Sequence, residues 1–212
     1  MVMGSKSDIF AGVEEIAKLK NLTKLNLRLH ENLTAEGLFQ IAKLQNLTEL
    51  NLWRTKVTDA GLKEIAKLKN LTKLTLWATS TQVTDTGLKE IANLQNLTEF
   101  NSWYIKHPSK YEEIAKLQNL TKLNLNYTDV TAARLKEIAK LKKLTHLHLS
   151  GILHFRDNGL KEIAKLQNLT ELDLGWCGFI TDAGSKEISK LQNLTKLRLG
   201  SNFTDTSLKE IA

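Results

Sequence analysis

Cysteine, proline and long apolar runs are nearly absent from this sequence of 212 residues. Its one cysteine, Cys177, excludes an internal disulfide and a zinc site made of several cysteines. A single thiol is typical of a reducing compartment, which favours a cytoplasmic location. The sequence has no run of about 18 apolar residues, so it predicts no membrane span. Residues 1–7 also lack the apolar segment of a signal peptide.

The phrase Leu-Thr-x-Leu-x-Leu, or a close variant of it, occurs eight times at intervals of 23 to 26 residues. The phrase begins at Leu22, Leu47, Leu71, Leu97, Leu120, Leu144, Leu169 and Leu194. Its Thr is the same in all eight units, which predicts packing or hydrogen bonding along a sheet. We therefore divide the chain into an N-terminal half repeat or cap helix, residues 1–21, and a repeat array, residues 22–212, whose last unit is truncated.

Each unit combines two periodicities. Apolar and polar residues alternate over residues 47–52, as in a short strand, whereas residues 62–68 place apolar side chains at helical spacing. Thr58 or Asp59 is well placed to cap that helix. One such unit cannot bury its apolar side alone, so stacked units must share one core.

This pattern resembles the leucine-rich repeat. Three predicted helix starts resemble those of F-box-type and certain bacterial leucine-rich-repeat proteins. They read TDAGL at residues 58–62, TDTGL at residues 84–88 and TDAG at residues 181–184. The resemblance implies an α/β solenoid of about eight repeats, a curved horseshoe with a concave parallel sheet and convex helices. Because the family is chiefly a recognition scaffold, the resemblance implies binding without naming a ligand.

The sequence departs from the family pattern at several points. The ninth position of such repeats usually holds Asn or Cys, but here Ile105 and Ile152 occupy it in two units, and Cys177 in another is expected to be buried and inert. In the irregular fourth unit, Ser109 and Glu112 form a capping-box pattern that predicts a helix start. The array ends inside a predicted helix, so we expect a piece of a longer protein and self-association through exposed solenoid ends.

The third, fifth and seventh positions of each unit are expected to point onto the concave face. At the seventh position, Trp53, Trp77 and Trp103 fall on consecutive strands, about 4.8 Å apart, and should form a ladder. Exposed aromatic groups commonly mark interaction sites, although these rings could instead pack on one another. The candidate partner-binding residues are Trp53, Trp77, Trp103, Tyr104, Tyr127, Trp176, Asn51, Thr75, Asn101, Asn124, Glu49, Lys73, Glu99 and Lys122.

A second group of polar residues lies on two later strands. His146 and His148 share one face of a strand, and Glu171 and Asp173 lie beside them on the next. His146, His148 and Asp173 are candidate ligands for a transition metal, and a His–carboxylate pair could do acid–base work. An ordinary patch of paired charges is the alternative that we favour, because no nucleophile motif or phosphate loop accompanies these residues. We expect neither catalysis nor a cofactor.

The net charge of +7 raises the question of a polyanionic partner. Most of the excess falls in Lys/Glu-rich helices, as on an ordinary solvated face, so we expect no nucleic acid and no membrane partner. The sequence predicts a non-enzymatic recognition module that binds a protein or peptide on the concave face through the aromatic ladder. A carbohydrate-binding repeat protein and a designed or diversified scaffold binder are the alternatives.

Overall fold

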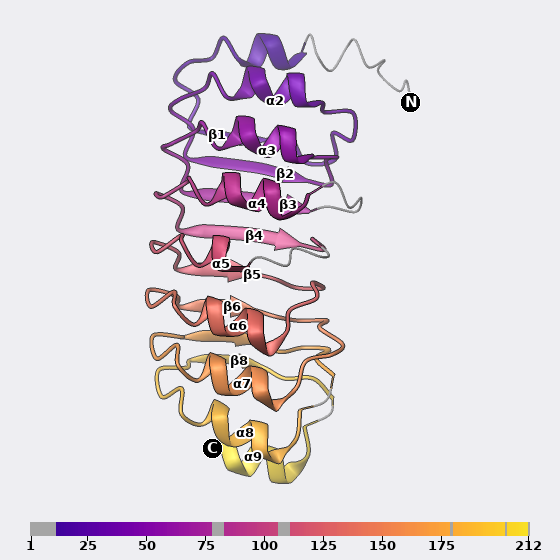
Figure 1. Cartoon of the computed structure of the whole chain (residues 1–212), viewed down its shortest axis with the longest axis vertical. Coiled ribbons are helices and arrows are strands. Elements are labelled where there is room, and N and C mark those ends of the chain that lie inside the picture. The colour runs from indigo at the N-terminus through magenta and orange to yellow at the C-terminus, as the bar shows by residue number, and fades with distance from the viewer. Residues whose placement is uncertain (1–11, 78–82, 106–110, 179, 202, 212) are drawn as a thin grey trace.

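The computed structural model describes residues 12–77, 83–105, 111–178, 180–201 and 203–211. In these ranges, strands and helices alternate as the repeats predict (Figure 1). The strands are β1 (Lys24–Asn26), β2 (Glu49–Trp53), β3 (Lys73–Trp77), β4 (Glu99–Trp103), β5 (Lys122–Asn124), β6 (His146–His148), β7 (Glu171–Asp173) and β8 (Lys196–Arg198). The helices are α2 (Ala35–Ile41), α3 (Asp59–Ile65), α4 (Asp85–Ile91), α5 (Tyr111–Ile114), α6 (Ala132–Ile138), α7 (Asp157–Ile163), α8 (Asp182–Ile188) and α9 (Asp205–Ile211). A helical turn over residues 12–16 precedes β1, within the predicted cap.

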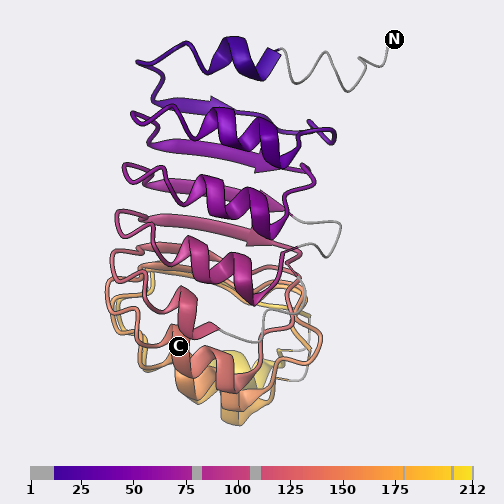
Figure 2. The same ribbon diagram turned by 45° about the horizontal axis from the view of Figure 1, so that its top comes forward.

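The described strands form one parallel sheet in chain order, from β1 to β8. Equivalent residues of neighbouring units pair, so that Leu50 lies between Leu25 and Leu74. The helices cover one face of this sheet (Figure 1). In the turned view of Figure 2, the N-terminal repeats remain separated, whereas the C-terminal repeats overlap. The stack of repeats is therefore curved, with the sheet on its inner side. The predicted α/β solenoid is confirmed.

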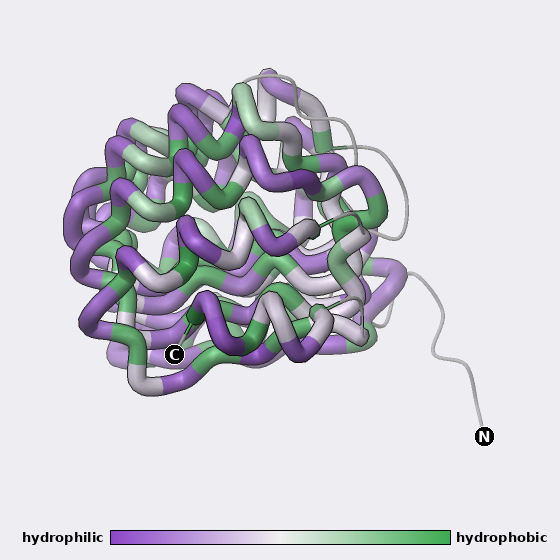
Figure 3. Tube along the Cα trace, turned by 90° about the horizontal axis from the view of Figure 1, so that it is seen from below, coloured by the Kyte–Doolittle hydropathy of each residue, from purple (hydrophilic) through white to green (hydrophobic). Residues whose placement is uncertain are grey.

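One hydrophobic core runs between the sheet and the helices. Leu50 and Leu52 of β2 and Leu62 and Ile65 of α3 are all buried in it, and their equivalents continue the core in the other units. Figure 3 shows the same succession of hydrophilic and hydrophobic segments in turn after turn of the tube. Because each unit buries its apolar side against the next, the core depends on stacking, as the sequence predicts.

Two rows of side-chain hydrogen bonds tie neighbouring units together. Each repeated Thr donates its hydroxyl to the carbonyl of the Thr in the unit before; the Oγ1–O distance is 3.0 Å from Thr145 to Thr121 and 3.2 Å from Thr170 to Thr145. In most units, the Asn two residues before this Thr donates its side-chain amide to a turn carbonyl of the previous unit, with 2.9 Å from Asn70 Nδ2 to the Gln45 carbonyl; in the sixth unit Lys143 stands in its place. The prediction that this Thr is structural is confirmed, and the Asn-Leu-Thr phrase recurs because both polar side chains join units.

The TDxGL phrase joins units as well as starting helices. Thr58 caps α3, since its Oγ1 accepts a hydrogen bond from Gly61 N at 3.3 Å. The carboxylate of Asp59 in turn accepts hydrogen bonds from the next unit, from Thr84 N at 2.8 Å and Thr84 Oγ1 at 2.5 Å. Gly87 lies so close that a Cβ there would stand 2.3 Å from Asp59 Oδ1. The aspartate of the preceding unit therefore restricts this position to glycine.

The irregular units are accommodated by the core. Helix α5 includes Glu112 and starts its described part at Tyr111, whereas Ser109, the predicted cap, lies outside the described residues. Tyr111 is only 1% exposed, and burial raises the pKa of its hydroxyl to about 12. Ile105 and Ile152 replace a polar ninth residue with a buried apolar one, which adds to the core.

No helix in the described ranges has the length and apolarity to cross a membrane.

Candidate functional site

The three tryptophans at the seventh position lie side by side, as predicted. The register pairs Trp53 with Trp77 and Trp77 with Trp103. Their ring centroids are 4.3 Å apart for Trp53 and Trp77 and 5.6 Å apart for Trp77 and Trp103, with the planes tilted by 47° and 32°. All three side chains are half-buried because the rings cover one another. Trp77 and Trp103 bury their Nε1 atoms, which find no hydrogen-bond partner among the described residues.

Two tyrosines extend this row. Tyr104 lies 5.9 Å from Trp77, and Tyr127 lies 5.8 Å from Trp103, between ring centroids. The two tyrosine rings stack on each other at 5.1 Å with an interplanar angle of 9°. We call these five rings, Trp53, Trp77, Trp103, Tyr104 and Tyr127, the aromatic cluster. It runs along the carboxyl ends of β2 to β5.

The tyrosines occupy the eighth position of their units, where the backbone is left-handed. The φ angle is 61° at Tyr104 and 56° at Tyr127, and Leu29, Arg54 and Trp176 share this conformation at the equivalent position. At Tyr127, the N–H still donates to the next strand, 2.8 Å from the Ser150 carbonyl, before the chain turns away. Such a φ is uncommon for residues other than glycine. The one residue type at this position that signals it is Gly151 of the sixth unit, with a φ of 76°, and sequence reasoning missed it.

Two arginines flank the tryptophan end of the cluster. The Cζ atom of Arg28 lies 4.0 Å from the centroid of the Trp53 ring. The Cζ atom of Arg54 lies 5.4 Å from Trp53 and 5.2 Å from Trp77. Both arginines are exposed, and within the described parts of the chain neither forms an ion pair with a carboxylate. Arg28 is the seventh residue of the first unit and was therefore expected on the concave face, but its stacking on Trp53 was not predicted.

An apolar cavity of about 330 Å³ adjoins the tyrosine end of the cluster. Tyr104, Tyr127, Ile152 and Leu153 line it, together with Gly151 and Asp129. Gly151 has a φ of 76°, and a Cβ there would stand 2.4 Å from the Tyr127 ring. The glycine therefore lets this ring lie against the backbone of the next unit. Leu153 is 68% exposed at the cavity and belongs to the irregular turn of residues 151–158, which the sequence suggested as part of a wider binding surface.

Trp176 does not join the cluster in the described structure. It has the same position in its unit as Tyr127, but it follows β7, two strands beyond β5, and it is 70% exposed. Its predicted role in binding a partner is therefore separate from the aromatic cluster and stays a prediction. A shared position places residues on one edge of the sheet, but contact also needs adjacent strands.

The fifth-position amides serve the strands themselves. Asn51 Oδ1 accepts a hydrogen bond from Trp53 N at 2.9 Å, and Asn124 Oδ1 accepts one from Asn126 N at 2.9 Å. These oxygens are thus engaged in holding the seventh residue of the same unit. Thr75 and Asn101 lie half-buried between them in the register. Asn51 and Asn124 keep their Nδ2 groups as donors for a ligand, and each Oδ1 has one further lone pair.

The third-position charges pair along the sheet. Glu99 lies between two lysines, with Oε2 2.9 Å from Lys73 Nζ and Oε1 3.0 Å from Lys122 Nζ. Glu49 Oε1 lies 2.6 Å from Lys24 Nζ. The hydrogen bond to Glu99 raises the pKa of Lys73. These residues lie on the predicted face, but they already satisfy one another's charge.

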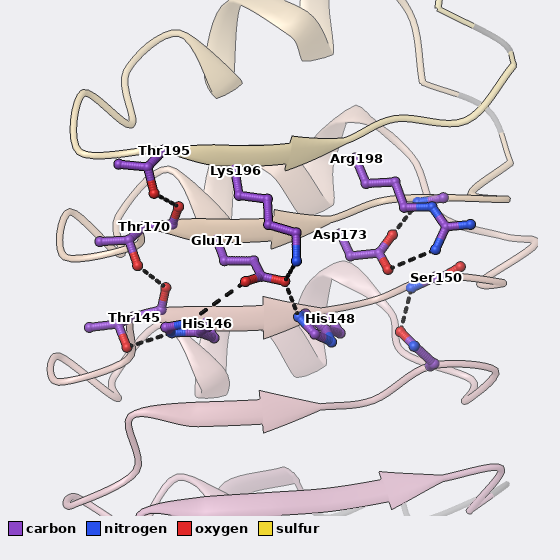
Figure 4. Close-up of polar contacts among 12 residues, drawn as sticks. Thr145, His146, His148, Ser150, Thr170, Glu171, Asp173, Thr195, Lys196 and Arg198 are labelled. Atoms are coloured by element: carbon purple, nitrogen blue, oxygen red, sulfur yellow. Dashed lines mark hydrogen bonds and ion pairs between the residues drawn. The ribbon is translucent and has the colours of Figure 1, made fainter.

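His146 and His148 likewise lie in a row of polar contacts centred on Glu171 (Figure 4). Glu171 accepts from Lys196 Nζ at 2.8 Å and contacts His148 Nε2 at 3.0 Å, and His146 Nε2 stands 3.8 Å from its other oxygen. The hydrogen bonds from Lys196 and His148 lower the pKa of Glu171. This row and the aromatic cluster are distinct parts of the same face.

Asp173 lies opposite His148 in the register, but its carboxylate is engaged by other groups: Arg198 NH1 is 3.6 Å from its Oδ2, and Gly175 N donates to its Oδ1 at 2.8 Å. The part of the chain that the structure describes contains no group of three His, Cys, Asp or Glu side chains that could hold a metal ion. The metal set of His146, His148 and Asp173 is therefore not assembled in it. Cys177 is buried as predicted; burial raises its thiol pKa to about 12, and its Sγ lies 3.2 Å from the Leu149 carbonyl.

Comparisons with known proteins agree with this architecture. Residues 18–42, 43–66 and 165–189 match the family model described as Leucine Rich repeat. Internalin C2 of Listeria monocytogenes is 28% identical, with a TM-score of 0.58 over 87% of this chain and 74% of that chain. A leucine-rich-repeat protein of Leptospira interrogans is 27% identical, with a TM-score of 0.58 over 93% of this chain and 54% of that chain, so this chain spans about half its length.

A second internalin of Listeria monocytogenes, 17% identical with a TM-score of 0.50 over 97% of this chain and 79% of that chain, supports the fold alone. The search of curated proteins finds no match.

Proposed function

We propose, from the premise that this chain is a leucine-rich-repeat protein, that it binds a protein or peptide through the aromatic cluster on its sheet face. Leucine-rich-repeat proteins are commonly protein-binding modules and typically lack enzymatic activity. The observation that carries the proposal is the run of five touching rings, Trp53, Trp77, Trp103, Tyr104 and Tyr127, along the carboxyl ends of four adjacent strands. Large aromatic side chains dominate the binding energy of many protein interfaces.

The ring geometry favours a protein or peptide over a carbohydrate. A sugar ring stacks on an open aromatic face, but Trp53 and Trp77 overlap at 4.3 Å, and Tyr104 and Tyr127 stack on each other. What the cluster offers is a continuous apolar strip of ring edges, which suits aliphatic or aromatic side chains of another chain. The rigid sheet beneath it also loses little conformational entropy on binding.

A paired capture experiment tests the proposal. The native chain and a variant with Trp53→Ala, Trp77→Ala and Trp103→Ala serve as bait for lysate of a candidate source or host, and mass spectrometry identifies the bound proteins. Each partner is then purified and its affinity measured with both baits. Circular dichroism must show that the variant keeps its fold.

The matched control removes exposed apolar side chains from elsewhere, with Leu19→Ala, Phe39→Ala and Leu208→Ala. We expect a partner whose affinity falls at least about tenfold with the tryptophan variant and stays unchanged with the control. Equal capture by the folded tryptophan variant and the native chain would assign the rings to packing and refute the proposal.

A further inference from the structure

The two ends of the aromatic cluster differ in chemistry. At one end, Arg28 and Arg54 lie against Trp53 and Trp77 with exposed guanidinium groups. At the other end, Tyr127, Gly151, Ile152 and Leu153 line an apolar cavity of about 330 Å³. The rings between them form an unbroken series of contacts, so a single bound segment can touch both ends.

Among the residues that the structure describes, no carboxylate neutralises the basic end. The lysines of the third position pair with Glu49, Glu99 and Glu171, whereas no carboxylate in the described ranges pairs with Arg28 or Arg54. Residues 78–82 and 106–110, which follow β3 and β4 in the sequence, contain no Asp or Glu. Each guanidinium presents several N–H donors in a plane that matches a carboxylate.

The cavity end has the opposite preference. Its lining is mainly apolar, and the polar residues in it include both Asp129 and His154. An aliphatic or aromatic side chain there would replace water against Ile152, Leu153 and the Tyr127 ring. The exposed guanidinium groups at one end and the apolar cavity at the other therefore give the strip a direction.

We infer that this strip binds an extended acidic–apolar peptide segment, with an Asp or Glu side chain at Arg28 and Arg54 and an apolar side chain in the cavity beside Tyr127 and Gly151. Strands are about 4.8 Å apart, so the three to four strand spacings from Arg54 to the cavity span roughly 14–19 Å. An extended peptide advances about 3.3 Å per residue, which puts the acidic and apolar residues roughly four to six positions apart. This inference rests on the proposed function and adds the chemistry and spacing of the partner.

A random peptide library displayed on phage tests it, with purified chain as the immobilised bait. Four further baits are used: the triple tryptophan variant, Arg28→Gln with Arg54→Gln, Leu153→Ser, and a control with Lys63→Gln and Lys89→Gln. The control makes the same change in net charge on exposed helix positions of α3 and α4. Peptides enriched on the native chain are synthesised, and their affinities are measured at low and high salt.

The expected peptides carry Asp or Glu and an apolar residue at the stated spacing. Their affinity should fall about fivefold to tenfold with the double arginine variant, mainly at low salt, and stay unchanged with the lysine control. With Leu153→Ser, selection should keep the acid and lose the apolar preference. Peptides that depend on the tryptophans but show no acid, or no such spacing, would overturn the inference and leave the proposed function standing. If no peptide depends on the tryptophans, both are wrong.

Discussion

Replacing Gly87 with alanine should destabilise the solenoid, although alanine is the better helix former. In the middle of an ordinary helix, Ala is favoured over Gly by roughly 0.5–1 kcal/mol. At Gly87, the new Cβ would stand 2.3 Å from Asp59 Oδ1 and 2.7 Å from Leu62 Cδ1. Ordinary contact begins at 3.4 Å, so the carboxylate must move by 3.4 − 2.3 = 1.1 Å.

Such a movement breaks the two hydrogen bonds that Asp59 accepts from Thr84. Hydrogen bonds to charged groups contribute about 1.5–3 kcal/mol each, and partial exposure of this pair places them near the lower end or below it. A loss of about 2–4 kcal/mol, offset by the helix preference, leaves a net destabilisation of about 1–3 kcal/mol. Urea unfolding followed by far-UV circular dichroism measures it.

Gly12→Ala is the matched control, because Gly12 is also helical and a Cβ there meets nothing within 4 Å. This variant should be as stable as the native chain or slightly more stable. A second check adds Gly87→Ala to Asp59→Ala, where the carboxylate is gone and only the contact with Leu62 Cδ1 remains. The glycine change should then cost at least about 1 kcal/mol less than it does alone. Equal effects of Gly12→Ala and Gly87→Ala, or strict additivity in the double variant, would refute the role given to Asp59.

Three further predictions concern other parts of the frame and the sheet face. Thr145→Val should reduce the free energy of unfolding by about 0.5–1.5 kcal/mol, because it removes the hydroxyl that joins two units; Thr145→Ser should cost less in the same urea assay. The pKa of Glu171 is lowered in the fold, chiefly by Lys196, so its stabilising effect is present above the ordinary value of 4.5 and is lost as the pH falls through the folded pKa. Glu171→Gln should therefore shrink the fall in Tm between about pH 6 and pH 3, and an unchanged fall would contradict this. Because burial raises the thiol pKa of Cys177 to about 12, iodoacetamide at about pH 8 should modify the native thiol at least about a hundredfold more slowly than the thiol in urea; equal rates would refute its burial.

The frame could be predicted from the sequence because the units act as internal comparisons. A residue that stays the same in unit after unit, such as the Thr of Leu-Thr-x-Leu-x-Leu, has one structural task repeated at each step. That Thr58 or Asp59 caps α3 followed from their place before an apolar helical pattern, and the structure makes Thr58 the cap. The partner of Asp59 could not be predicted, because the sequence of one unit does not reveal which side chain of the next unit comes within hydrogen-bond distance.

Only those parts of the site that follow from the alternation of side chains along a strand could be predicted from the sequence. The Trp ladder follows from period two and parallel register, which together fix the neighbours of Trp77. Tyr104 and Tyr127 meet the ladder through a left-handed backbone turn, and neither residue type favours that conformation. The cavity beside Gly151 depends on the path of the turn after β6, which has no repeating pattern to compare.

The paired charges of the sheet also bear on where a partner can gain binding energy. A partner lying over Glu99 would compete with Lys73 and Lys122, and exposed pairs of this kind contribute only about 0–1 kcal/mol each. Replacing one such pair by another therefore yields little affinity, although a mismatched charge there would be rejected. Covering the aromatic cluster removes apolar surface from water without breaking any of these pairs. Under the proposed function, the third-position charges would thus select which partners are tolerated, while the seventh- and eighth-position rings would supply the affinity.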